Sequence, residues 1–340
     1  MIGPRDVGRL RGDAKAVRSS LGRALRRPKT YTSAVKELLW TGVNVAMYPA
    51  GLLSEALEQD ASGAFGGRFS RELPLCYLEP EAAATPIILL HGYFHNRSGF
   101  LVMRRALRRN GFRHVHTMNY NVIGHEVEEL ASQLSGYVEN ILNRTGATRV
   151  HLVGHSLGGL VARTYVQEFG GDKRVHTCIT MGTPHAGTYA AWAGRGRAAR
   201  QLRPRSELLE RLNSDTRETP VRYISYYSNL DPLVVPASSA KLTTPALHAT
   251  NVLVKDHGHM SFLMSGELIH SVLETLSTLD RTKTAIAPVT ALPSARSRRN
   301  GSSSATGSSC FTRRSRIFLS IGLRSASATT DVTETVVAAK

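Results

Sequence analysis

The stretch RVHLVGHSLGGLVARTY, residues 149–165, decides the fold of this chain. Its first part is a β-rich apolar run, and its second part has the apolar spacing of an amphipathic helix. Between them stands a G-x-S-x-G pattern, residues 154–158, whose glycines allow a sharp turn from strand to helix. Such a turn lifts the side chain of Ser156 clear of the sheet. We therefore predict that Ser156 is a catalytic nucleophile. The alternative is a glycine-rich turn whose serine only caps the helix.

A nucleophile that attacks a carbonyl group needs N–H donors for the oxyanion that develops. The amide of Leu157, at the start of the helix, is the first candidate. A second donor should come from a loop after an earlier strand, and HGYFHNRSGF, residues 91–100, follows the apolar run IILL. We expect the amide of Tyr93 to be this donor, with the amide of Phe94 as the alternative.

The rest of the chain from residue 72 alternates between strand and helix patterns. This alternation predicts an α/β fold with a mainly parallel central sheet and helices on both faces. The expected strands are ELPLCYL (72–78), TPIILLHG (85–92), HVHTMNY (114–120), RVHLVG (149–154), RVHTCITMG (174–182), VRYISYYS (221–228) and TNVLVKD (250–256). The expected helices span residues 98–111, 125–146, 156–170 and 261–279.

The acid that assists the nucleophile should follow it along the chain and precede the histidine. The aspartates in that interval are Asp172, Asp215, Asp231 and Asp256. Only Asp231 directly follows a β-rich strand, in YISYYSNLDPLVVP, where a rigid strand end can hold a carboxylate in the cleft. We therefore predict Asp231 as the acid.

The base should come from DHGHMSF, residues 256–262, which carries His257 and His259 just past the last strand. The base needs one ring nitrogen near Ser156 and the other held by the acid. A metal site would need three or four converging ligands, and no matching His/Asp cluster stands at another strand end, so we expect no metal. These residues alone leave the choice between His257 and His259 open.

Together these stretches resemble the α/β-hydrolase lipases and esterases, especially bacterial triacylglycerol lipases with an HG-x oxyanion loop. The matching stretches are PIILLHGYF, VHLVGHSLGGLVAR, MGTPHAGT, SNLDPLVVP and GHMSFL, spread over about residues 72–280. The family's histidine lies in a GH-x-x-hydrophobic context, which matches His259. The resemblance implies the α/β-hydrolase fold, a catalytic triad of Ser156, Asp231 and His259, and oxyanion donors Tyr93 and Leu157.

The segment of residues 185–219 is a long polar insertion between a strand and Asp231. In enzymes of this family such an insertion forms a cap over the acyl pocket, so we expect it to be a lid. The alternative is a plain surface excursion. The residues expected in the lid or in contact with substrate are Phe94, His155, Trp192, Leu208, Leu209 and Leu212.

The net charge of +17 is concentrated at the two ends of the chain. Residues 1–30 carry nine Lys and Arg against two acidic residues, and residues 281–340 carry ten against two. The 250 residues between them are nearly neutral, with 24 basic and 22 acidic side chains. We therefore expect no specific nucleic-acid partner, and we interpret residues 1–30 as a basic disordered arm and 281–340 as a low-complexity basic tail.

The segment 31–71 contains LLWTGVNVAMYPAGLL, residues 38–53, which is too short and too interrupted to span a bilayer. We expect a helical segment that packs on the protein or lies at a membrane surface, so residues 1–60 are candidates for peripheral membrane contact. The N-terminus lacks the pattern of an ordinary secretory signal. The expected location is cytoplasmic or peripherally membrane-associated. Three cysteines without a CxxC pair argue against a disulfide framework.

The sequence therefore predicts a catalytic domain over residues 72–280 that cleaves carboxylic esters of lipid-like acyl substrates through an acyl-enzyme. The substrate is a lipid or a small ester, and no cofactor is expected. One alternative is an acyltransferase or a thioesterase that uses the same triad. Another, of a different class, is a catalytically silent membrane-associated scaffold.

Overall fold

The central sheet of the protein is parallel throughout. A computed structural model describes residues 42, 75, 77–93 and 95–279. Within them six strands lie in the order β2-β1-β3-β4-β5-β6, and every neighbouring pair is parallel. The predicted α/β fold class is confirmed. The strands are β1 (Ile87–Leu90), β2 (Val115–Met118), β3 (Val150–His155), β4 (Val175–Met181), β5 (Arg222–Tyr227) and β6 (Thr250–Leu253).

One predicted strand does not appear among the residues that the structure describes. Among the described residues of ELPLCYL, Leu75, Tyr77 and Leu78 have no strand structure, and helix α4 begins at Pro80. Leu75 and Leu78 instead pack as partly buried side chains against the core. The apolar spacing of this stretch therefore reflects packing of an irregular segment, which periodicity alone does not distinguish from a short strand.

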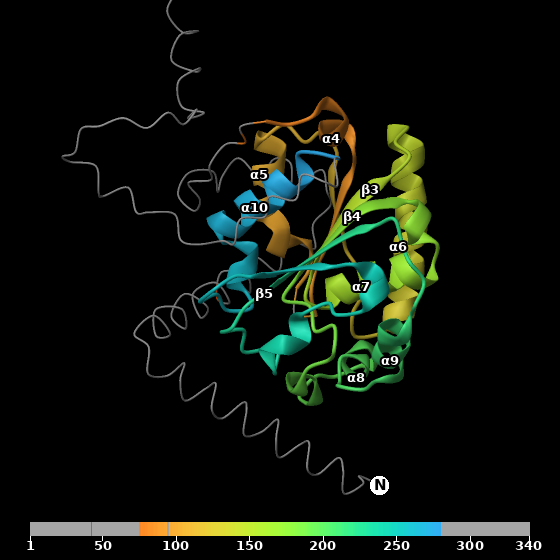
Figure 1. The fold of residues 1–340 in the computed structure, drawn as a ribbon, viewed down its shortest axis with the longest axis vertical. Helices are drawn as coiled ribbons and strands as arrows, with labels where there is room; N and C mark the ends of the chain where they lie inside the picture. The colour runs from red at the N-terminus through yellow and green to blue at the C-terminus, as the bar shows by residue number, and fades with distance from the viewer. Residues whose placement is uncertain (1–41, 43–74, 76, 94, 280–340) are drawn as a thin grey trace, which may run out of the picture. The chain divides into compact units, whose positions relative to one another are not determined.

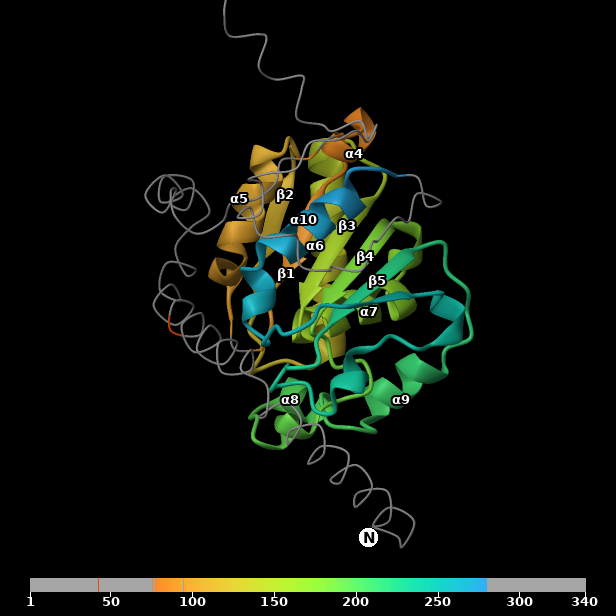
Figure 2. The same ribbon diagram turned by 60° about the vertical axis from the view of Figure 1, so that its left-hand side comes forward.

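Helices cover both faces of the sheet (Figures 1 and 2). Alternate residues of β1 point to opposite faces: Ile87 and Leu89 belong to the cluster with α5 and α10, whereas Ile88 and Leu90 belong to the cluster with α6 and α7. The helices are α4 (Pro80–Ala84), α5 (Leu101–Arg109), α6 (Val127–Thr145), α7 (Leu157–Glu168), α8 (Arg197–Gln201), α9 (Glu207–Ser214) and α10 (Gly266–Leu276).

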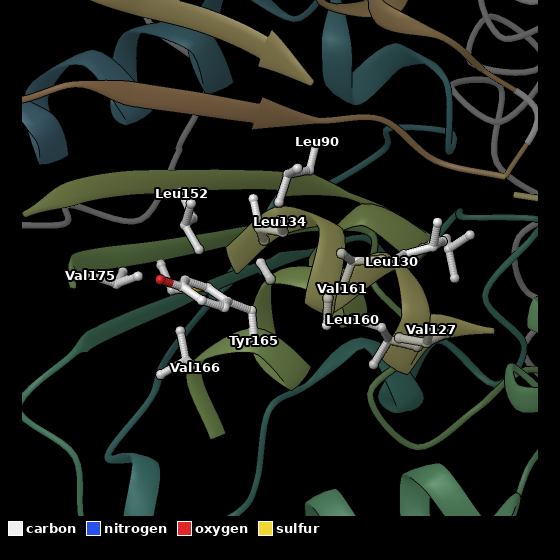
Figure 3. Packing of buried hydrophobic residues seen from close by; sticks show 14 of the residues in the cluster. Leu90, Val127, Leu130, Leu134, Leu152, Leu160, Val161, Tyr165, Val166 and Val175 are labelled. Atoms are coloured by element: carbon white, nitrogen blue, oxygen red, sulfur yellow. The ribbon is translucent and has the colours of Figure 1, made fainter. Parts of the chain in front are cut away.

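Helix α6 shows how the sequence defines such an element. A capping box between Glu126 and Glu129 begins it, and Gly146, with φ of 71°, ends it in the left-handed conformation. Its apolar side chains, spaced three and four residues apart, are buried against α7 and the sheet (Figure 3). These side chains include Val127, Leu130, Leu134, Val138 and Ile141.

The insertion between β4 and β5 holds helices α8 and α9, which Figures 1 and 2 show at one end of the sheet. The fully buried Arg163 of α7 anchors it. The guanidinium donates to the Leu212 carbonyl over 2.7 Å, to Asn213 Oδ1 over 2.9 Å and to Thr244 Oγ1 over 2.8 Å. The helix that follows Ser156 and the insertion are therefore fixed to each other.

No helix in the described part of the chain is both long and apolar enough to cross a membrane. The predicted arm 1–30, tail 281–340 and, apart from residue 42, helical segment 31–71 lie outside the described residues. The expected membrane contact through residues 1–60 lies there too.

Candidate active site

Ser156 stands alone between the end of β3 and the first residue of α7. Its backbone has φ of 54° and ψ of −122°, a strained conformation for a residue with a side chain. Its amide donates to the Met181 carbonyl over 2.9 Å, which pins the turn to the end of β4. The strain and the strand-to-helix position are those expected of an elbow that presents a nucleophile.

The glycines around this elbow are required by close backbone approach. A Cβ on Gly158 would lie 2.2 Å from the Leu90 carbonyl oxygen, so α7 could not pass so close to β1 with a larger residue there. A Cβ on Gly92 would lie 2.9 Å from the Ser156 Cβ. The backbone of the loop that follows β1 therefore runs directly beside Ser156.

Asp231 and His259 form a buried pair. Asp231 Oδ2 lies 2.7 Å from His259 Nδ1, and the two side chains are 2% and 4% exposed. The other carboxylate oxygen, Oδ1, accepts hydrogen bonds from the amides of Leu233 and Val234 at 2.9 and 3.0 Å. Because an ionised carboxylate only accepts, it holds the His259 proton on Nδ1 and leaves Nε2 as the basic atom.

The pair lies close to Ser156. A Cβ on Gly182, the residue after the Met181 carbonyl that binds the Ser156 amide, would lie 3.1 Å from Asp231 Oδ2 and 3.3 Å from His259 Nδ1. Thus Asp231 and His259 lie beside the backbone that follows the partner of the Ser156 amide, and the three residues follow β3, β5 and β6 at the carboxyl edge of the sheet. Ligand sites of open parallel sheets occur at this edge.

The two histidines of DHGHMSF have different surroundings. His257 is half-buried; its Nδ1–H donates to the Lys255 carbonyl over 2.8 Å, and its Nε2 lies 3.0 Å from Ser265 Oγ. Ser265 caps α10. His257 therefore holds the start of the last helix, whereas His259 faces Asp231.

Asp215, another aspartate in the interval before these histidines, is engaged elsewhere. The Arg217 guanidinium binds it, and this hydrogen bond lowers the pKa of Asp215 to about 2. Its other partner is the Gln167 amide at 2.9 Å. Asp215 belongs to the base of the insertion.

The side chain of Tyr93 has a role that its sequence position did not suggest. Its hydroxyl donates to the Arg195 carbonyl and accepts a hydrogen bond of 3.0 Å from the Arg195 amide. This tie joins the loop after β1 to the insertion across 102 residues. Phe94, the alternative oxyanion donor and a predicted substrate contact, lies outside the described residues.

Neighbouring His91 holds the loop after β1. Its Nδ1–H donates to the Gly92 carbonyl over 3.0 Å, its Nε2 accepts from the Tyr120 amide over 3.3 Å, and its ring stacks on Tyr120. Burial lowers the pKa of His91 to about 4, so the ring stays neutral near pH 7.

A cavity of about 740 Å³ opens between three segments: the loop after β1, the turn after β2 and the insertion. Several polar groups in its wall are already engaged: Asn96 caps the turn at Ser98, and Asn121 Oδ1 accepts from the Ile123 amide. The wall offers aromatic rings and aliphatic side chains, which suit an apolar ligand. Its lining residues include Tyr93, His95, Tyr120, Val122, Ile123 and Arg195.

The predicted inner face of the lid is arranged differently in the structure. Leu208, Leu209 and Leu212 are each 1% exposed and belong to the core cluster of α6 and α7. Trp192 is 64% exposed, with the Arg203 guanidinium 4.4 Å from its ring centroid. None of the four is among the described residues that line the cavity. The leucines anchor the insertion, because the apolar face of α9 packs inward.

His155, predicted as a substrate contact, is fully buried. Its Nε2–H donates to the His259 backbone carbonyl over 2.9 Å. The sequence held one signal for this, since His155 adjoins the predicted nucleophile, but its partner lies 104 residues away.

Within the described residues no three His, Cys, Asp or Glu side chains converge on a point that could hold a metal ion.

Comparison with known proteins identifies proteins that share this fold. A family described as alpha/beta hydrolase fold matches residues 85–193. The chain is similar to a triacylglycerol lipase of Pseudarthrobacter phenanthrenivorans, with 48% identity over 56 residues that cover 16% of this chain and 17% of the relative. It is also similar to the sn-1-specific diacylglycerol lipase ABHD11 of Xenopus laevis, with 37% identity over 82 residues, covering 23% and 26% of the two chains.

These curated relatives are matched over about a sixth to a quarter of their own length. Among solved structures, the mature form of Bacillus licheniformis lipase BlEst2 aligns with a TM-score of 0.50 and 20% identity. This alignment covers 61% of this chain and 96% of BlEst2. The chain therefore has the fold of the α/β hydrolases and is similar to lipases over part of its length.

Proposed function

We propose that this protein is a serine hydrolase that cleaves carboxylic esters of apolar acyl groups, with Ser156, Asp231 and His259 as its catalytic triad. The observation that carries the proposal is the buried Asp231–His259 pair at 2.7 Å beside a serine held in a strained elbow. The names of the matched relatives, lipases of tri- and diacylglycerols, favour lipid-like esters as the substrate class.

The first half of the reaction forms an acyl-enzyme. His259 Nε2 removes the proton from Ser156 Oγ as the oxygen attacks the ester carbonyl carbon, which gives a tetrahedral oxyanion. His259 is then an imidazolium, and the Asp231 carboxylate stabilises its positive charge. The imidazolium proton passes to the leaving alcohol as the carbon–oxygen bond of the ester breaks.

The oxyanion would be held by backbone amides. The Leu157 amide belongs to the first residue of α7, and the Tyr93 amide follows Gly92, whose backbone runs beside Ser156. Both are fixed before substrate arrives, and preorganised donors of this kind stabilise the oxyanion strongly. Water, which gives a proton to His259 Nε2, then attacks the acyl carbon. That proton passes to Ser156 Oγ as the bond between the acyl carbon and Oγ breaks and the acid leaves.

The cavity of about 740 Å³ is the proposed place for the apolar part of the substrate. Two observations support this assignment. The wall includes Tyr93, next to Gly92 and hence to the Ser156 elbow, and several wall polar groups are engaged within the protein. An aliphatic chain in such a cavity gains about 25 cal/mol for each Å² of apolar surface removed from water.

The proposal is tested with purified protein and p-nitrophenyl esters of graded acyl length. Turnover should be found for at least one ester, and Ser156→Ala should remove it. A fluorophosphonate probe should label the wild-type protein and not Ser156→Ala. Undiminished turnover in Ser156→Ala would sink the assignment of the nucleophile. Product analysis with added alcohols or with thioesters separates hydrolysis from acyl transfer and thioester cleavage.

A further inference from the structure

His155 occupies an unusual place for a polar side chain. It is the last residue of β3, directly before Ser156, and its side chain is fully buried. A Cβ on Gly92 would lie 3.1 Å from His155 Nδ1, so the loop after β1 passes closely over the ring.

The hydrogen bond of His155 fixes its tautomer. Its Nε2 lies 2.9 Å from the backbone carbonyl oxygen of His259, and a carbonyl oxygen only accepts, so Nε2 carries the proton. Nδ1 has no hydrogen-bond partner among the described residues. Within the described part of the chain, the His155 imidazole therefore makes one hydrogen bond, which it donates to the backbone of the residue proposed as general base.

The ring of His155 also contacts the ring of His259. The two ring centroids are 4.6 Å apart and the planes are tilted by 51°, while His95 meets His155 edge-on at 5.8 Å. Burial first, and then the neighbouring His259 and His95, hold the pKa of His155 well below its usual value. His155 thus stays neutral and adds no positive charge beside the imidazolium that forms on His259.

The topology explains why such a contact is needed. His259 follows β6, and β6 is separated from β3 by β4 and β5 in the sheet. With about 4.8 Å between neighbouring strands, the two strand ends are roughly 14 Å apart. The loop after β6 must therefore reach back across two strands to bring His259 to Ser156, and His155 binds its backbone where it arrives.

We propose that His155 is a positioning residue that fixes the separation between Ser156 and His259 by holding the His259 backbone carbonyl. This inference rests on the proposed function. Its physical basis is that one residue joins the nucleophile covalently and the base by a buried hydrogen bond. Errors of about 1 Å in such geometry lower turnover by about 100-fold.

Three substitutions of His155 separate the hydrogen bond from the volume and polarity of the ring. His155→Gln keeps an N–H donor with nearly the same reach, His155→Asn carries the same amide on a shorter side chain, and His155→Leu is apolar. We expect kcat on a p-nitrophenyl ester to fall about 10- to 100-fold in His155→Leu and His155→Asn, with KM within about twofold. His155→Gln should recover kcat to within about fivefold of the wild type.

The matched control is His151→Leu. His151 is also fully buried, lies four residues earlier on β3, and makes no ring hydrogen bond to any described residue. Its replacement should leave kcat unchanged. Thermal unfolding of every variant, followed by circular dichroism, separates loss of geometry from loss of folded protein.

Equal kcat values for the Gln and Asn variants would overturn the positioning role. So would a loss of kcat that merely follows the fraction of unfolded protein, or an equal loss in His151→Leu. If His155→Leu does not fold, the comparison of kcat between His155→Gln and His155→Asn still tests the positioning role. Wild-type protein that neither hydrolyses esters nor reacts with a fluorophosphonate would overturn the proposed function, and this inference with it. Active wild-type protein with unaffected Asn and Leu variants would overturn the inference alone.

Discussion

The hydroxyl of Ser228 donates a hydrogen bond of 2.6 Å to the backbone carbonyl of His257, which ties the loop that carries Asp231 to the loop that carries His259. A second tie runs between the same loops, because Asn229 Oδ1 accepts from the Asp256 amide over 3.0 Å. Asp231 and His259 each lie two or three residues from these ties. The two loops that carry the pair are therefore joined by side chain–backbone hydrogen bonds that do not involve the side chains of Asp231 and His259.

Replacement of Asp231 by Asn should remove most activity without removing the fold. The asparagine oxygen can keep the hydrogen bonds from Leu233 and Val234, so its NH₂ group would turn toward His259 Nδ1. That donor forces the His259 proton onto Nε2. A protonated Nε2 can no longer accept the proton of Ser156 Oγ. We expect kcat to fall by about 10³- to 10⁴-fold, measured on the best ester. Activity within tenfold of the wild type would contradict the role of the acid.

The two histidines of DHGHMSF should respond in opposite ways to replacement by alanine. His259→Ala removes the proposed base and should abolish ester turnover. His257→Ala removes only the contacts to Lys255 and Ser265, so more than about a third of kcat should remain. The two variants are compared at equal concentrations of folded protein. The reverse pattern would mean that His257 is the base.

Replacement of Tyr93 by Phe tests the tie between the loop after β1 and the insertion. The ring and the backbone amide remain, but the hydrogen bonds with Arg195 are lost. Because Tyr93 and Arg195 both line the cavity, the insertion should become freer to move away from it. We expect kcat/KM for short esters to stay within about threefold, and the ratio of long-chain to short-chain kcat/KM to rise.

The control for this substitution is Tyr77→Phe, because Tyr77 is 64% exposed. It should leave the chain-length profile unchanged. An unchanged profile in Tyr93→Phe as well would show that the tie does not shape the cavity.

Stability should fall in mild acid because of buried histidines. Burial lowers the pKa of His151 to about 3, below the value of about 6.5 in an unfolded chain. Between these values the unfolded state binds a proton that the folded state does not, so the free energy of unfolding decreases as pH falls below about 6.5. Each such histidine contributes a slope of about 1.4 kcal/mol per pH unit within its window.

His151→Leu removes one of these groups and should reduce the loss of stability between pH 7.5 and 5, measured by urea unfolding. It should also raise the free energy of unfolding at pH 7.5 by about 1 kcal/mol, because the ring nitrogens of His151 have no hydrogen-bond partner among the described residues. The control is His248→Asn, since the side chain of His248 is 74% exposed. If His151→Leu keeps the full acid sensitivity, burial of His151 is not its cause.

Local patterns in the sequence predict the sheet and its helices well. The strand-to-helix turn at Ser156 follows from glycine spacing, and α6 from its caps and apolar period, because both depend on neighbours within a few residues. The three described residues of ELPLCYL form no strand, because an apolar alternation only requires buried side chains, which an irregular segment also provides.

Contacts between distant segments account for what the sequence did not predict. The Tyr93 hydroxyl meets Arg195 across 102 residues, and the His155 ring meets the His259 carbonyl across 104. Neither contact can be recognised from the residues that surround either partner in the sequence. The leucines of α9 show the same limit, since amphipathic spacing identifies an apolar face but does not say whether that face meets a ligand or the core.

The hydrogen bond from the Gly182 amide to the Tyr226 carbonyl, 2.9 Å long, has a consequence for how this protein can diversify. It extends the parallel pairing of β4 and β5 by one residue past Met181, so the sheet stays intact up to the point where the insertion leaves it. A change in the length of such a loop costs only about 0.6 kcal/mol for each doubling. Changes of length within the insertion, between Gly182 and Val221, should therefore reshape the cavity wall at Arg195 while β4 and β5 keep their register.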